Sequence, residues 1–112
     1  MDLDFESKFK DIILKMDKVG QEYAEAKGQS WQMQELKNSV LSKIIKESGV
    51  DAISKAEVVA KSSDEYRDYI GATAQAITKE LKLKSTYEKH KASFEALRSL
   101  SSLEKKTRDL IN

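Results

Sequence analysis

The sequence predicts an all-α protein: a long antiparallel helical hairpin with a short corner helix, which associates with further copies into an oligomeric helical bundle or coiled coil. Three observations predict it. The 112 residues contain no Pro and only four Gly, and a Pro costs about 3 kcal/mol inside a helix. Apolar residues recur at alternating intervals of four and three, as they do on helices that pack lengthwise. Signals that end or start a helix gather between residues 48 and 63, which leaves two long helices and a short one.

The first predicted helix covers about residues 4–47. Asp4 is a candidate N-cap, because its side chain can accept a hydrogen bond from a free backbone N–H of the first turn. The apolar spacing is that of a coiled-coil seam as far as Met33, and the broader stripe beyond it predicts burial on more than one side. The residues that we expect to form the oligomer interface are Phe5, Phe9, Ile12, Met16, Val19, Tyr23, Leu36, Val40 and Ile44.

Three glycines bear on the continuity and the end of this helix. Gly20 and Gly28 lie inside it, and each costs about 1 kcal/mol relative to Ala, so a break near Gly28 is an alternative to one continuous helix. Gly49 follows the last polar turn, and we expect it to end the helix in the left-handed conformation.

Two capping boxes predict the starts of the remaining helices. Ser54 with Glu57, and Ser62 with Glu65, have the spacing at which each side chain can bond the backbone N–H of the other residue. We therefore expect a short helix at about 54–61 and a long one at about 63–111. With the short helix as the corner, residues 1–112 form a single predicted domain.

Composition excludes several classes of function. The 20 basic and 19 acidic residues nearly cancel, so the chain as a whole is not a polycation. Without Cys and with His90 as the one histidine, neither thiolate chemistry nor a His-rich metal site is expected. No catalytic grouping or phosphate loop is present, so we predict no enzyme activity and no cofactor. The acidic start is unlike a signal peptide, and no apolar run approaches the ~18 residues of a membrane span, which predicts a cytoplasmic protein.

Lysines are concentrated in the third predicted helix, with Tyr87 among them. This segment is the candidate surface for a phosphate backbone, because cations beside an aromatic ring suit single-stranded nucleic acid. The alternative is a solvated face with Glu–Lys pairs such as Glu80–Lys84. The cluster consists of Lys79, Lys82, Lys84, Lys89 and Lys91. A weaker group, formed by Lys37, Lys43 and Lys46, could join it only in an oligomer.

Trp31 lies off the seam of the first helix. A tryptophan in such a place usually belongs to a second packing face, and otherwise it is an anchor for a partner protein.

Three segments resemble a known group of proteins: residues 54–66, Tyr87-Glu88, and residues 94–99. They are similar to small helical proteins encoded by bacteriophages beside single-strand annealing or recombination genes. The layout of long helix, corner and long helix is also similar to recombination mediators of the UvsY type. The resemblance implies an oligomeric accessory factor in the host cytoplasm that binds single-stranded DNA and helps a recombinase or annealing protein. Arg98, at a recurring position of the phage group, is interpreted as a surface contact and joins the candidate nucleic-acid-binding residues.

Two other functions stay open at the level of sequence. The chain could be a protein-interaction module, for example a phage-encoded inhibitor or adaptor of a host or phage enzyme, without nucleic-acid binding; its near-neutral charge and Trp31 favour this. It could also be a structural bundle component of a virion or a larger complex.

Overall fold

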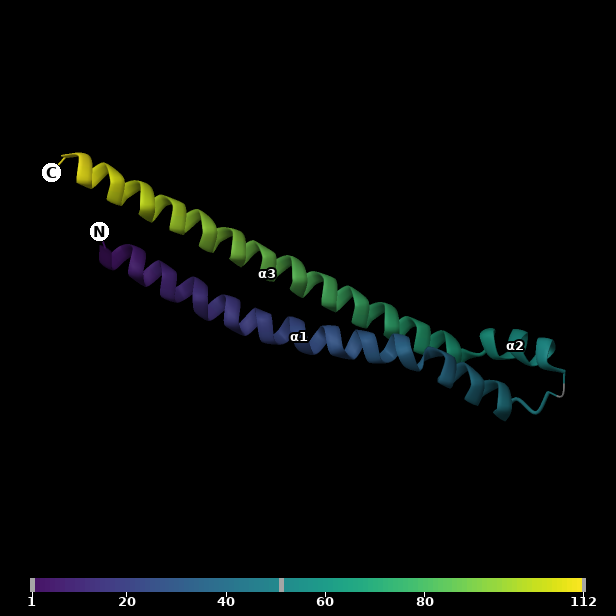
Figure 1. Cartoon of the computed structure of the whole chain (residues 1–112). Coiled ribbons are helices and arrows are strands. Elements are labelled where there is room, and N and C mark those ends of the chain that lie inside the picture. Colours follow the sequence, from purple (N-terminus) through teal and green to yellow (C-terminus); the bar gives the residue numbers. More distant parts are fainter. Residues whose placement is uncertain (1, 51, 112) are drawn as a thin grey trace. The chain divides into compact units, whose positions relative to one another are not determined.

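The computed structural model describes residues 2–50 and 52–111, which form three helices joined by short turns (Figure 1). Helix α1 spans Asp2–Glu47, α2 spans Ile53–Lys61 and α3 spans Asp64–Ile111. No strand occurs in this part of the chain. The all-α class and the helical hairpin are thereby confirmed, whereas association with further copies stays a prediction.

Contacts divide the chain into two compact units. The single domain over residues 1–112 stays a prediction. Unit 1 comprises Met1–Ala24 with Lys82–Asn112, and unit 2 comprises Glu25–Leu81. Both long helices therefore contribute to both units. The division has a simple physical reason: paired helices touch only across their local seam, so residues far apart along the same helix share no core.

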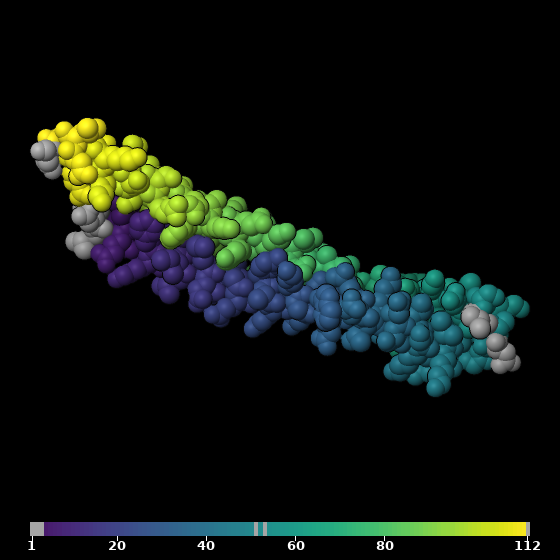
Figure 2. Space-filling view, in the orientation of Figure 1, coloured from purple at the N-terminus to yellow at the C-terminus, as the bar shows by residue number. Residues whose placement is uncertain are grey.

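In unit 1 the first part of α1 packs antiparallel to the last part of α3, and atoms of the two segments lie side by side (Figure 2). The rings of Phe9 and Phe94 meet edge to face with centroids 5.5 Å apart. The rings of Tyr23 and Tyr87 lie 6.5 Å apart. A Cβ atom at Gly20 would lie 3.4 Å from the Tyr87 ring, so the glycine leaves that ring room to lie close to the α1 backbone.

The inward row of α3 in unit 1 mixes apolar and polar residues. The buried or half-buried positions are Leu83, Tyr87, His90, Phe94, Leu97, Ser101 and Glu104. By contrast, Leu100 and Leu103 are 57% and 61% exposed and face outward. These seven positions keep the four-three spacing of a coiled-coil seam throughout, although three of them, His90, Ser101 and Glu104, are polar.

Unit 2 has an interior of small side chains. Its buried residues include Ala26, Ala56 and Ala60. Ser30 is also fully buried, and its hydroxyl accepts a hydrogen bond of 2.9 Å from the Gln34 side-chain amide on the next turn. Small side chains at these points allow the helices to approach closely.

A hydrogen bond between helices reinforces unit 2. The Tyr69 hydroxyl on α3 donates to the Met33 carbonyl oxygen on α1. Thr73, one turn further along α3, is buried and donates to the Tyr69 carbonyl oxygen at 2.9 Å.

The ends of α1 differ in part from the prediction. The helix already begins at Asp2, so Asp4 lies inside it and cannot be the N-cap; its carboxylate pairs with Lys8 at 3.3 Å instead. The helix runs through Gly28 without a break. Gly49 has a φ of 70°, which confirms the left-handed residue that was expected after the last turn.

Both predicted capping boxes are wrong in detail. The N-cap of α2 is Ala52, with no side-chain hydrogen bond, so Ser54 already lies within the helix. At α3 the cap is Ser63, whose hydroxyl oxygen accepts from the Tyr66 N–H at 3.1 Å. Ser62 bonds backward to the Val58 carbonyl oxygen at 2.6 Å and so belongs to the end of α2. Either of the two adjacent serines could have capped α3. Ser62 is used by the end of α2, so Ser63 is the cap.

The residues predicted to join copies lie mostly inside one chain. Phe9 and Tyr23 contact α3 rings of the same chain, and Ile44 is buried. Leu36 is 47% exposed and is the exception. The half-buried members are Phe5, Phe9, Ile12, Met16, Val19, Tyr23 and Val40. These side chains are thus partly buried within one chain, and a role of the set between copies stays a prediction.

Candidate nucleic-acid interface

Positive charge is concentrated in the last part of α3. Residues 82–111 contain eight Lys and Arg but four Asp and Glu, although the whole chain is nearly neutral. Any attraction for a polyanion is therefore local to this segment, within unit 1.

Four of these cations lie in one line. Lys84, Lys91, Arg98 and Lys105 follow one another at intervals of seven residues, and seven residues make two turns of a supercoiled helix. All four are exposed, and we call them the basic row. Arg98 pairs with Glu95 at 3.6 Å, while Lys84, Lys91 and Lys105 form no ion pair with described residues. The exposed pair of Arg98 with Glu95 is worth little in water, so all four positive charges can bind a ligand.

The predicted lysine cluster is not a single surface. Lys84, Lys91 and Arg98 belong to the basic row, but Lys82 and Lys89 are exposed about 150° away around the helix axis. Lys79 belongs to unit 2. The prediction missed Lys105, which stands apart from the dense lysine run. The signal that finds it is the seven-residue period.

Tyr87 is directed toward α1. Its ring lies beside the Tyr23 ring and the Gly20 backbone and is half-buried, so less of it is exposed than the sequence alone suggested. The aromatic rings near the basic row are instead those of Phe5 and Phe9 on α1.

A groove of about 320 Å³ adjoins the basic row where it reaches Arg98 and Lys105. We call it the Phe5 groove. Its lining combines aromatic rings, serine hydroxyls and cations, which are the groups that stack with bases and hold phosphates in single-strand-binding proteins. The lining residues are Phe5, Phe9, Arg98, Ser101, Ser102, Glu104, Lys105 and Arg108.

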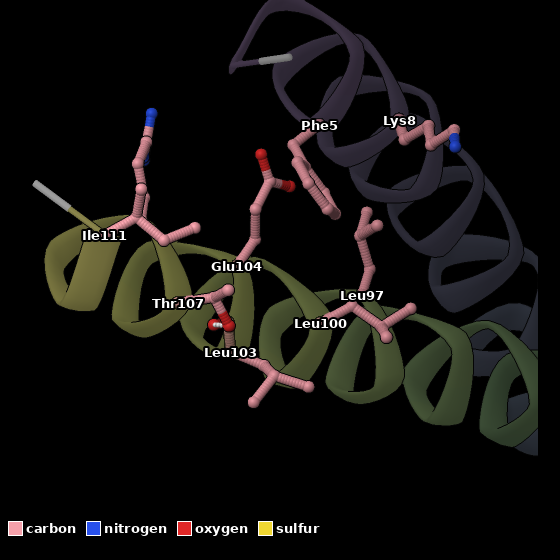
Figure 3. Close-up of a pocket in the computed structure, with 9 residues that line it drawn as sticks. Phe5, Lys8, Leu97, Leu100, Leu103, Glu104, Thr107 and Ile111 are labelled. Carbon is pink, nitrogen blue, oxygen red and sulfur yellow. Dashed lines mark hydrogen bonds between the residues drawn. The ribbon is translucent and has the colours of Figure 1, made fainter.

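Glu104 is the one acid in that lining. Its side chain points toward α1 and lies beside Phe5 (Figure 3). The Oε1 atom is buried and has no hydrogen-bond partner among the described residues. A buried acceptor without a partner lowers stability by about 1–3 kcal/mol, and by more when it is charged. A ligand that donates a hydrogen bond to Oε1 would offset this cost.

A second groove in unit 1 is largely apolar and has a volume of about 600 Å³. Figure 3 shows Leu97 pointing toward α1 and Leu103 pointing away from it. The groove is lined by Phe5, Lys8, Leu97, Leu100, Leu103, Glu104, Thr107, Arg108 and Ile111. Apolar surface of this kind on a helix pair suits the apolar face of another helix.

Two other features were sought in the described part of the chain: a metal site and a membrane-spanning helix. It contains no group of three or more His, Asp or Glu side chains arranged to hold a metal ion. Within the same residues no helix combines the length and the apolar character that crossing a membrane requires. Trp31, in unit 2, is 64% exposed and contributes little to packing within the chain.

Comparison with family models, curated proteins and solved structures found no match to this chain. The resemblance to phage recombination proteins therefore stays a prediction.

Proposed function

We propose that this chain is a non-enzymatic protein that binds single-stranded nucleic acid along the basic row of α3. The observation that carries the proposal is the seven-residue period of four exposed cations. Cations in line along a helix follow the path of a sugar–phosphate backbone, and the Phe5 groove adds rings for base stacking. The row is flanked by Glu88, Glu95 and Asp109, so we expect moderate affinity.

Two matched double variants test this proposal. Lys84→Glu/Lys91→Glu reverses two charges of the basic row, and Lys82→Glu/Lys89→Glu reverses two charges on another side of the same helix. Binding of a fluorescein-labelled single-stranded 20-mer is measured by anisotropy at several salt concentrations. The row variant should bind at least about tenfold more weakly, and its slope of log affinity against log salt should be smaller by about one for each phosphate that it no longer neutralises.

The control variant should stay within about threefold of the wild type, because its lysines do not lie along the bound backbone. Equal reductions of affinity in both variants would mean that only net charge matters. Absence of binding by the wild type at low salt would refute nucleic-acid binding altogether. Circular dichroism checks that each variant keeps its helix content.

The biological setting that we propose is that of a phage recombination-accessory protein, which binds single-stranded DNA together with a recombinase or annealing protein. Its support is the sequence resemblance, joined to a surface suited to single strands. Co-purification with the annealing protein or recombinase encoded beside its gene would test it. Recovery that is abolished by nuclease would show that DNA alone links the two proteins.

A protein-interaction module is the second candidate, and the apolar groove of unit 1 favours it. On this hypothesis an amphipathic helix of a partner protein lies in the groove, with apolar residues at four-three spacing against Leu100 and Leu103. Leu100→Lys/Leu103→Lys should then abolish recovery of the partner, while the row variant should not affect it. The opposite result would favour the nucleic-acid proposal.

A further inference from the structure

We infer that the Phe5 groove binds one unpaired base and selects bases that carry an exocyclic amino group. This inference rests on the proposed function, since it assumes that a single strand follows the basic row. The strand would bring a base to the groove wherever the backbone passes Arg98 and Lys105.

The groove has the parts that such a base needs. Phe5 provides an apolar ring, and a base that stacks on it leaves water. Arg98 and Lys105, both exposed, stand where they can hold the phosphates on either side of that base. A volume of about 320 Å³ has room for a single base.

Selectivity follows from Glu104. Its Oε1 atom is buried beside Phe5 without a hydrogen-bond partner among the described residues, so a base that enters must offer it a donor. Cytosine offers its N4 amino group, and acidic side chains accept from that group in known modes of base recognition. Thymine has its one N–H between two carbonyl oxygens, which repel a carboxylate. A base that leaves this buried acceptor unpaired should therefore bind more weakly than one that donates to it.

The test compares three single-stranded 12-mers on the full-length protein: oligo(dC), oligo(dT) and an abasic strand of equal length. Affinities are measured by anisotropy at one salt concentration. The wild type should bind oligo(dC) about three- to tenfold more tightly than oligo(dT), as expected for one hydrogen bond. Glu104→Gln should bring that ratio to about one, because an amide can accept from cytosine or donate to thymine.

Phe5→Leu separates stacking from charge. It should weaken binding of both oligo(dC) and oligo(dT) but leave binding of the abasic strand unchanged, because phosphate contacts do not need the ring. The ratio between the two bases corrects for any general gain in affinity when Glu104 loses its charge. Thermal unfolding of both variants shows whether unit 1 is intact.

Failure of the inference and failure of the proposed function give different results. Equal binding of all three strands by the wild type would retain the basic row and overturn the base site. A ratio above one that Glu104→Gln leaves intact would overturn the role of Glu104. Undetectable binding of every strand would overturn the proposed function and the base site together.

Discussion

Gly28 in α1 and Gly49 in the turn after it differ in whether the backbone requires a glycine. Gly28 lies in a continuous helix with no atom within 4 Å of an added Cβ, so nothing in the structure requires a glycine there. Gly49 has a φ of 70°, which an L-residue with a Cβ adopts only with strain. Gly28 is therefore a weak point of the helix, whereas Gly49 fits its position.

We expect Gly28→Ala to raise the free energy of unfolding by about 0.5–1 kcal/mol, because Ala has the better helix propensity. Gly49→Ala should lower it by about 1 kcal/mol, because the left-handed residue becomes strained. Urea denaturation followed by circular dichroism measures both changes. Destabilisation by Gly28→Ala would mean that the α1 backbone is not helical at that point.

Helix α3 presents chemically different sides in unit 1. The inward side carries Leu97, which is 8% exposed, and the outward apolar side carries Leu103, which is 61% exposed. The basic row lies on the side opposite the outward leucines, about 180° around the axis in heptad geometry. A ligand on the basic row and a helix against the outward leucines can therefore be bound at the same time.

The two sides should respond differently to truncation. Leu97→Ala removes a buried side chain and should cost about 2–3 kcal/mol of unfolding free energy. Leu103→Ala should change it by less than about 0.5 kcal/mol in dilute solution, since little of that side chain is buried within the chain. Chemical denaturation at low protein concentration gives both values. A large destabilisation by Leu103→Ala that grows with protein concentration would show that a second copy covers this side.

Much apolar surface is left uncovered across the described residues of all three helices. Leu14, Trp31, Val58, Leu103 and Leu110 are each more than 60% exposed. Scattered exposed apolar residues are ordinary, but a chain that buries few large side chains gains stability by sharing such surface with a partner.

We therefore expect the purified chain to associate, as the sequence predicted, although through outward residues and not through the seam of α1. Multi-angle light scattering across a tenfold range of concentration measures the mass. A Leu100→Lys/Leu103→Lys variant should shift the population toward the monomer if unit 1 mediates the contact. A strictly monomeric wild type at every concentration would contradict association.

The hairpin was readable from the sequence because its signals are local. Each signal depends on residues within one or two helical turns: the four-three spacing, the absence of Pro and the glycine at position 49. The capping serines were misassigned by one residue at α3, since Ser62 and Ser63 are chemically equivalent until the end of α2 is known. The division into two units depends on contacts between distant segments, which spacing within one helix does not reveal.

The candidate site was only partly predictable. Three of the six predicted cations lie on one row, because the density of lysines along the chain does not specify the side of the helix. The aromatic partners were missed: Phe5 and Phe9 lie at the opposite end of the sequence from Lys105, and antiparallel packing brings them to the same groove. Glu104 was unremarked, since an acid on an inward position is recognised only when its burial is known.

The equal spacing of the basic row sets the length of single strand that α3 can contact. From Lys84 to Lys105 the helix advances about 32 Å at 1.5 Å per residue, with a positive charge at every second turn. A single strand gains contacts only while it still extends along this span. Affinity should therefore rise with oligonucleotide length in steps and then level off, so that the length at the plateau gives a measure of how far the strand is stretched.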